Sequence, residues 1–228
     1  MSVPQLPLAL RYPPDQRLES FVDAPEGVTV HLHALAQVQG ADWLYLAGAT
    51  GTGKTHLALA LCAATEAAGR RAAYLPMIAA SGRLRHALEA LEGNDVVALD
   101  GLEAIAGVRD DEVALFDFHN RARSAGLNVL YTARAAPDAL GLDLPDLRSR
   151  LSQCIRVVLP TPDDESRREI LRDRAQRRGL VLEDAAVELQ ADWVVMGAFG
   201  HSRLRETLFG GVTRYFINSA RFPLLLVH

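Results

Sequence analysis

The stretch "GATGTGKT", Gly48 to Thr55, decides the fold prediction. It satisfies the pattern G-x-x-x-x-G-K-[ST], follows the apolar run "WLYLA" (43–47) and opens the helical pattern "HLALALCAATEAAG" (56–69). In this setting glycines let successive backbone N–H groups converge on phosphate oxygens, and the helix N-terminus adds partial positive charge. The stretch therefore predicts a phosphate-binding loop, or P-loop, rather than a glycine-rich turn that matches the pattern by accident.

The motif gives roles to individual side chains. The expected cofactor is ADP or ATP with Mg²⁺. Lys54 is expected to reach the β-phosphate, and in ATP also the γ-phosphate, and Thr55 is expected to place its hydroxyl on Mg²⁺. Asp100 ends the apolar run "DVVALD" (95–100) and is the expected acidic contact to the same metal ion. The predicted nucleotide-binding residues of the loop are Gly48, Thr50, Gly51, Thr52, Gly53, Lys54 and Thr55.

Working outward, apolar runs of strand length alternate with helical patterns. The expected strands are 42–48, 72–76, 95–100, 128–133 and 154–159, and the expected helices are 55–68, 83–91, 113–125 and 165–178. Continuous apolar strands separated by helices indicate a parallel sheet that is covered on both faces. The predicted fold class is a P-loop α/β sandwich of three layers.

Composition limits the class of protein. The chain has 228 residues and a formal net charge of -4, which argues against a basic surface for non-specific duplex binding. Its longest apolar stretches, such as 58–64 and 224–227, are too short to span a bilayer, so no membrane association is expected and the cytoplasm is the expected location. Cys62 and Cys154 lack metal-ligand or disulfide spacing and are interpreted as reduced packing residues.

Five further strings carry a family resemblance. They are "WLYLAGATGTGKTHLALALCAA", "VVALDGLEAIAG", "FDFHNRARSAG", "LYTARAAP" and "LGLDLPDLRSRL". In this order and at these spacings the chain resembles, over about residues 1–189, the Hda family of DnaA-like AAA+ proteins, regulatory inactivators of the bacterial replication initiator DnaA. The resemblance implies that the chain stimulates ATP hydrolysis by DnaA and so regulates initiation negatively.

The N-terminal hexapeptide "QLPLAL" matches a partner-binding motif of that family at Gln5, Leu6, Leu8 and Leu10. The family's motif docks on the replicative sliding clamp. Its glutamine forms hydrogen bonds with backbone groups, and its leucines fill an apolar groove on the clamp. The alternative is that these leucines fold back onto their own domain.

The resemblance also assigns polar residues near the nucleotide. Thr132 and Arg134 in "LYTARAAP" match the position that reads the γ-phosphate, although Arg134 fits a surface charge equally well. Arg150 in "LRSRL" matches the arginine finger that acts in trans, and it is expected at the rim of the nucleotide-binding face. A salt bridge at a helix end is the alternative for Arg150 and its neighbour Arg148.

Hydrolysis by the chain itself is expected to be weak or absent. AAA+ ATPases carry a carboxylate directly after the metal-binding aspartate, and that position is Gly101 here. Glu103 is a candidate substitute that acts through a water molecule, and a surface role is equally favoured. Whether the chain is itself an enzyme is therefore left open.

The C-terminal stretch does not follow the Hda pattern. From about residue 191 it resembles the last strand-loop-helix-strand unit of the universal stress protein family, with the glycine pattern Gly197, Gly200 and Gly210. The predicted domains are a clamp-binding peptide (1–14), an AAA+ domain (15–160), truncated lid helices (161–190) and a universal-stress-protein-like fragment (191–228).

Two alternatives to the regulator remain. One is a nucleotide-binding stress-protein-like dimer, and the other is a DnaA-like initiator or helicase loader. The loader is weakened by the lack of a helix-turn-helix, so no direct sequence-specific DNA binding is expected. A homo-oligomer is left open.

Overall fold

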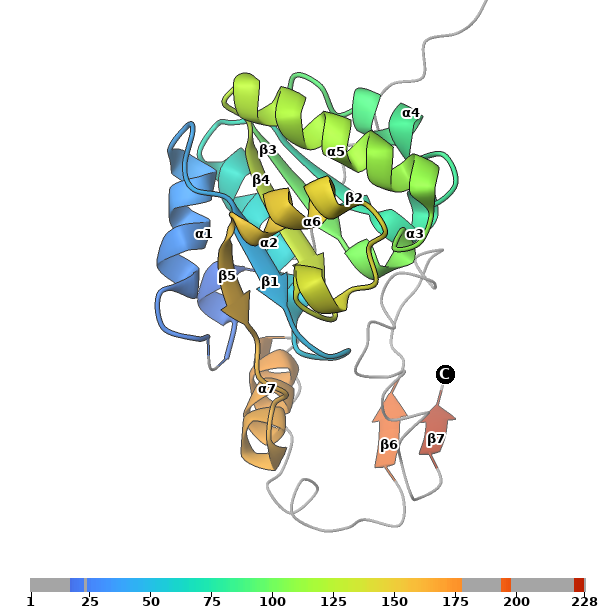
Figure 1. Cartoon of the computed structure of the whole chain (residues 1–228). Helices are drawn as coiled ribbons and strands as arrows, with labels where there is room; N and C mark the ends of the chain where they lie inside the picture. The colour runs from blue at the N-terminus through green and yellow to red at the C-terminus, as the bar shows by residue number, and fades with distance from the viewer. Residues whose placement is uncertain (1–16, 23, 178–193, 198–223, 228) are drawn as a thin grey trace, which may run out of the picture. The chain divides into compact units, whose positions relative to one another are not determined.

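Five parallel strands, in the order β2-β3-β4-β1-β5, form the sheet at the centre of the computed structural model (Figure 1). The structure describes residues 17–22, 24–177, 194–197 and 224–227. All five expected strands are confirmed with boundaries shifted by at most a few residues. They are β1 (Leu44–Ala47), β2 (Ala72–Pro76), β3 (Val96–Asp100), β4 (Asn128–Ala133) and β5 (Ile155–Val158).

The helices that precede residue 164 cover the sheet and connect its strands. The α-helices are α1 (Val28–Gln37), α2 (Lys54–Ala67), α3 (Met77–Ala80), α4 (Leu84–Glu89), α5 (Arg109–Ser124), α6 (Pro145–Ser152) and α7 (Asp164–Arg177). Short 3₁₀ helices are η1 (Leu18–Ser20), η2 (Leu102–Ala104) and η3 (Pro137–Ala139). The expectation for 113–125 began too late, because α5 includes an acidic first turn that favours a helix N-terminus.

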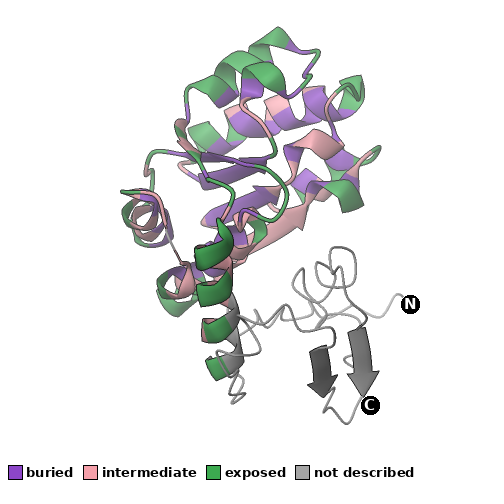
Figure 2. Cartoon of the chain, turned by 90° about the horizontal axis from the view of Figure 1, so that it is seen from below, coloured by how far each residue is buried: buried purple, intermediate pink, exposed green. Residues whose placement is uncertain are grey.

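The sheet separates two apolar cores, which gives the predicted three layers. Side chains alternate across β1, so Leu44 and Leu46 face α1 and α2 while Tyr45 and Ala47 face α5 and α6. The inner strands β1, β3 and β4 are buried on both faces, as the purple ribbon in Figure 2 shows, whereas the edge strands β2 and β5 are only partly buried. This packing explains why the strands read as continuous apolar runs rather than as alternating ones.

The P-loop sheet lies in the first of two compact units, residues 1–163, and α7 begins the second unit, residues 164–228. The second unit also holds a parallel pair of strands, β6 (Val194–Gly197) and β7 (Leu224–Val227). These are the strands expected in the C-terminal fragment. The helix expected between them, the hexapeptide Gln5–Leu10, most of the lid beyond α7, Gly200 and Gly210 lie outside the described residues, and Gly197 ends β6.

Within the described ranges, no helix has the length and apolar character that crossing a membrane requires.

Candidate functional site

The backbone of the P-loop is shaped by two glycines in the left-handed region. Gly51 has φ 87° and Gly53 has φ 91°, a conformation that L side chains rarely adopt. At Gly53 a Cβ would also lie only 2.4 Å from the ring of Phe21, which follows η1. Within the loop the buried Thr52 hydroxyl donates to the Ala49 carbonyl at 3.0 Å. The loop conformation therefore depends on the residues that the motif requires.

Lys54 stands at the start of α2 with its ammonium group turned onto the loop. Its Nζ donates to the carbonyl oxygens of Gly48 at 2.6 Å and Ala49 at 2.7 Å. Partial burial lowers the pKa of Lys54, while the negative charges of Glu103 and Asp100 act to raise it. A phosphate placed in the loop would compete with the two carbonyls for the ammonium protons.

Asp100 is the point where four elements meet. Its Oδ2 accepts hydrogen bonds from Thr55 on α2 and from Tyr74 on β2, both at 2.8 Å. Its Oδ1 accepts from the Thr132 hydroxyl on β4 at 2.5 Å, and Thr132 accepts in turn from the Gly101 backbone N–H. Strand pairing places Asp100 beside Thr132 in register. The structure thus brings together the residues that the sequence assigned to metal and γ-phosphate contact.

The donor set fits Mg²⁺. Thr55 and Asp100 present hard oxygen ligands 2.8 Å apart at the carboxyl end of the sheet. Over the described part of the chain no cluster of three or more His, Cys, Asp or Glu side chains is present. Magnesium often takes only one or two protein ligands and completes its octahedron with water and substrate phosphates.

Glu103 lies beside the site on η2. Its Oε2 accepts a hydrogen bond from the Arg134 backbone N–H at 3.1 Å, while the Arg134 side chain is exposed. Gly101, in the position where a catalytic carboxylate was sought, adopts φ 86°. Glu103 therefore joins the loops after β3 and β4, and its electrostatic effect reaches Lys54.

Arg150 and Arg148 lie exposed on α6, away from the P-loop of their own chain. After α6, the backbone N–H of Ile155 donates a hydrogen bond to the carbonyl oxygen of Trp43, the residue before β1. The P-loop follows the other end of β1. Arg150 also acts electrostatically on His119, whose ring packs on Trp43. The end of α6 therefore lies near the amino ends of β1 and β5, whereas the P-loop follows the carboxyl end of β1. That Arg150 lies at the rim of the nucleotide-binding face, available to a neighbouring subunit, stays a prediction.

Sequence patterns did not indicate two neighbours of the site. Tyr74 contacts Asp100 through the pairing of β2 with β3, a long-range contact without a local motif. Phe21 packs over Gly53, and its ring centroid lies 5.6 Å from that of His56 on α2. The aromatic residue ahead of the first helix was the only signal that could have marked this contact.

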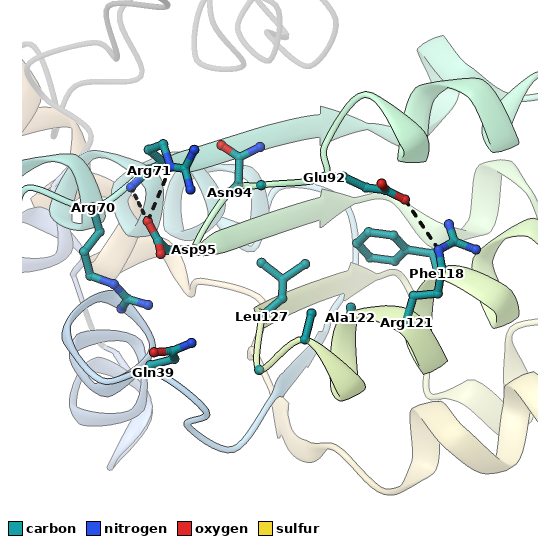
Figure 3. Close-up of a pocket in the computed structure, with 13 residues that line it drawn as sticks. Gln39, Arg70, Arg71, Glu92, Asn94, Asp95, Phe118, Arg121, Ala122 and Leu127 are labelled. Carbon is teal, nitrogen blue, oxygen red and sulfur yellow. Dashed lines mark hydrogen bonds and ion pairs between the residues drawn. The ribbon is translucent and has the colours of Figure 1, made fainter.

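A pocket of about 430 Å³ lies at the other end of the strands (Figure 3). Phe118, Ala122 and Leu127 give it an apolar floor, and charged side chains lie around them. Those charges are already engaged, since Arg71 contacts Asp95 and Arg121 contacts Glu92. Arg70 donates to the Leu35 and Ala36 carbonyls at the end of α1. These contacts join the loops at the amino ends of the strands, away from the P-loop, and leave the charges around the pocket already paired.

Comparison with protein families agrees with the geometry of the P-loop. Residues 12–135, more than half of the 228, match the family described as IstB-like ATP binding protein. The chain belongs to the IstB-like ATP binding protein family. A second family, the universal stress protein family, matches residues 120–228. That match starts well before the fragment expected from residue 191, although β4 and β5 within it belong to the P-loop sheet of this IstB-like protein.

Solved structures show which fold this IstB-like protein shares. Domain III of the Thermotoga maritima replication initiation protein DnaA superposes with a TM-score of 0.66 at 22% identity, over 77% of this chain and 80% of that one. AMPPCP-bound DnaA from Aquifex aeolicus gives 0.63 at 21%, over 78% of this chain and 60% of that one. DnaI gives 0.52 at 16%, over 64% and 88%. The fold is similar to that of domain III of DnaA, and this IstB-like protein spans about 60% of the Aquifex DnaA chain.

Proposed function

We propose that the chain binds ADP or ATP together with Mg²⁺ at the P-loop. The observation that carries the proposal is the convergence of Lys54, Thr55, Asp100 and Thr132 at the carboxyl end of the sheet. Membership of an ATP-binding family supports it. So does the fold shared with a DnaA that binds AMPPCP, a non-hydrolysable ATP analogue.

The further proposal is that the bound chain regulates replication initiation by acting on DnaA. Two features support action in trans. Gly101 leaves the position after Asp100 without a carboxylate, so the chain's own hydrolysis is slow. Arg150 is exposed on α6, which ends near the amino ends of the strands, so its guanidinium group is open to a phosphate from a neighbouring subunit. An arginine supplied in trans stabilises the charge of the transferring phosphoryl group.

The clamp is the proposed tether, through Gln5, Leu6, Leu8 and Leu10. The support is the sequence match alone. A peptide of this kind docks by placing alternate side chains in a partner's groove, so it contributes to location and not to chemistry.

The stress-protein alternative draws support from the match to residues 120–228. That stretch includes β4 and β5, which pair on either side of β1 in the P-loop sheet. These strands are thus already used by the AAA+ fold, and the regulator remains the favoured function.

One assay tests the regulator directly. ATP hydrolysis by DnaA is measured with clamp-loaded DNA and either the parent chain, Arg150→Ala or Arg148→Ala. We expect Arg150→Ala to lose the stimulation by about 1,000-fold or more, as for other arginine fingers, with a much smaller loss in Arg148→Ala. Clamp capture should be retained in both variants and lost when Gln5 and Leu6 are both replaced by alanine. Equal stimulation by the parent and Arg150→Ala, or no stimulation by the parent, would contradict the in-trans mechanism.

A further inference from the structure

Asp100 is held by hydroxyl donors from both strands that flank β3. Thr132 on β4 donates to Oδ1, and Tyr74 on β2 donates to Oδ2, the same oxygen that accepts from Thr55. The carboxylate of an aspartate at a strand end otherwise rotates about its terminal torsion, which has broad minima. Donors on opposite sides remove that freedom and fix which oxygen faces Thr55.

Tyr74 acts here only as a donor. Burial, followed by the charge of Asp100 and the hydrogen bond to it, raises the pKa of Tyr74 well above the ordinary value. The Tyr74 O–H donates to the carboxylate oxygen at 2.8 Å. Its hydrogen bond to a charged acceptor belongs to the stronger class of such bonds.

We propose that Tyr74 is a positioning residue for the metal ion, which sets the Asp100 carboxylate so that Mg²⁺ is coupled to nucleotide binding. The inference rests on the proposed nucleotide function of the P-loop and names a residue that neither the motif nor the family match assigns. Magnesium requires near-ideal octahedral geometry at short distances. An aspartate that is already oriented therefore binds the hydrated Mg²⁺ with a smaller loss of side-chain entropy. Outer-shell partners of metal ligands typically contribute about 10- to 100-fold in metal affinity.

The chain contains a matched control for this hydroxyl. Tyr45 on β1 also lies in the sheet, and its hydroxyl donates to a backbone carbonyl, Ala135, at 2.8 Å. Its pKa is likewise raised by burial first. Tyr45→Phe therefore removes a partly buried tyrosine hydrogen bond of the same length as the one that Tyr74→Phe removes, but not one to Asp100.

The experiment measures ADP affinity by calorimetry with the whole chain, once in excess EDTA and once in saturating Mg²⁺. The dissociation constant in EDTA divided by the dissociation constant in Mg²⁺ reports how much the metal strengthens nucleotide binding. Tyr74→Phe should lower this ratio about tenfold, while the affinity in EDTA stays within about twofold of the parent. Tyr45→Phe should leave the ratio unchanged. Thr132→Val, which removes the other strand donor, should lower the ratio in the same direction and covers the case in which Tyr74→Phe folds poorly.

Each other outcome is distinct. An unchanged ratio in Tyr74→Phe, with or without a lower melting temperature, overturns the inference and leaves a structural bond between β2 and β3. A parent chain that binds ADP equally well with and without Mg²⁺ also overturns it, although nucleotide binding stands. A parent chain that binds no ADP overturns the proposed function, and the positioning role with it.

Discussion

His119 is a buried titratable side chain that the nucleotide site does not use. It is 2% exposed, its Nδ1 lies 3.0 Å from the Tyr131 hydroxyl, and its ring meets the edge of Trp43 at 4.6 Å between centroids. Burial, with smaller contributions from the positive charges of Arg123 and Arg150, lowers its pKa to about 4. The folded protein therefore holds this histidine neutral down to acidic pH.

The lowered pKa predicts an acid-sensitive fold. In the unfolded chain His119 takes up a proton near its ordinary pKa of about 6.5, whereas in the folded chain it does so only near 4. Its contribution to stability is thus fully present above the unfolded pKa and is lost as the pH falls between these values. The loss amounts to roughly 3 kcal/mol. Denaturant unfolding at pH 7 and at pH 4 measures it.

His119→Phe should have a smaller fall in the free energy of unfolding over that range than the parent. The control is His86→Gln, at a side chain 87% exposed, which should keep the parent's pH dependence. An identical pH dependence in His119→Phe and the parent would show that carboxylates alone set the acid sensitivity.

Residue-level predictions from sequence succeeded where a motif fixes spacing. Lys54 and Thr55 are adjacent in the P-loop, and Asp100 ends an apolar strand, so local sequence was enough to bring them to one edge of a parallel sheet. Tyr74 could not be assigned in this way. Its approach to Asp100 depends on the order in which β2 and β3 pair, which no local pattern encodes.

At the scale of elements, α5 is anchored by a buried carboxylate in its first turn. Glu112 is 0% exposed and accepts backbone N–H donors from Gly107 at 2.8 Å, Asp143 at 3.0 Å and Leu144 at 2.7 Å. These donors come from the loop before α5 and the loop before α6. The side chain therefore joins both loops to one helix end and accepts from three backbone N–H groups, of which the bond from Leu144 is buried.

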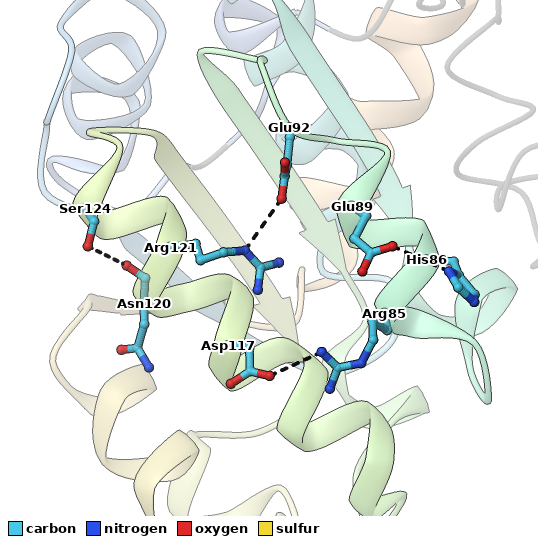
Figure 4. A network of polar contacts seen from close by, with 8 residues as sticks. All are labelled: Arg85, His86, Glu89, Glu92, Asp117, Asn120, Arg121 and Ser124. Carbon is cyan, nitrogen blue, oxygen red and sulfur yellow. Dashed lines mark hydrogen bonds and ion pairs between the residues drawn. The ribbon is translucent and has the colours of Figure 1, made fainter.

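Glu112→Ala should lower the free energy of unfolding by about 1 to 3 kcal/mol, because it leaves three backbone N–H groups without their acceptor, and the bond from Leu144 is buried. The control is Glu92→Ala. Glu92 follows α4 and makes an exposed ion pair at 3.5 Å to Arg121 of α5, within the polar network of Figure 4. That change should cost less than about 1 kcal/mol. Urea unfolding of the two variants compares them directly, and equal costs would contradict the anchoring role of Glu112.

Three α-helices were not expected from sequence: α3, which has only four residues, and the longer α1 and α6. In α6, "PDLRSRLS", only Leu147 and Leu151 are buried, so the apolar face is too narrow to register as a periodic pattern. In α1, "VTVHLHALAQ", β-branched and histidine residues have modest helix propensity. Packing of Leu32 and Leu35 against α2 stabilises the helix, a tertiary contact that a local reading does not contain.

At the scale of the whole chain, the fold class followed from sequence because each buried strand reads as an apolar run followed by a helix. The strand order did not follow from these runs. The order places β1 between β4 and β5, so the P-loop follows an inner strand of the sheet. Thr55, at the end of the loop, therefore lies beside Asp100, which also contacts Thr132. The second unit, residues 164–228, contributes one described helix and one described strand pair.

The central claim, that this sheet carries a nucleotide site, depends on one cation. Lys54 is the only lysine in the sequence, so no other ammonium side chain can replace it. Titration of Mg²⁺-ADP into the parent chain, Lys54→Ala and the remote control Arg85→Ala, followed by calorimetry, tests the claim most directly. We expect Lys54→Ala to weaken binding by about 100-fold or more, since it removes charge-assisted bonds of about 3 kcal/mol, at an unchanged melting temperature without nucleotide. Arg85→Ala should bind as the parent does. Equal affinity in Lys54→Ala and the parent, or no binding by the folded parent, would contradict the account.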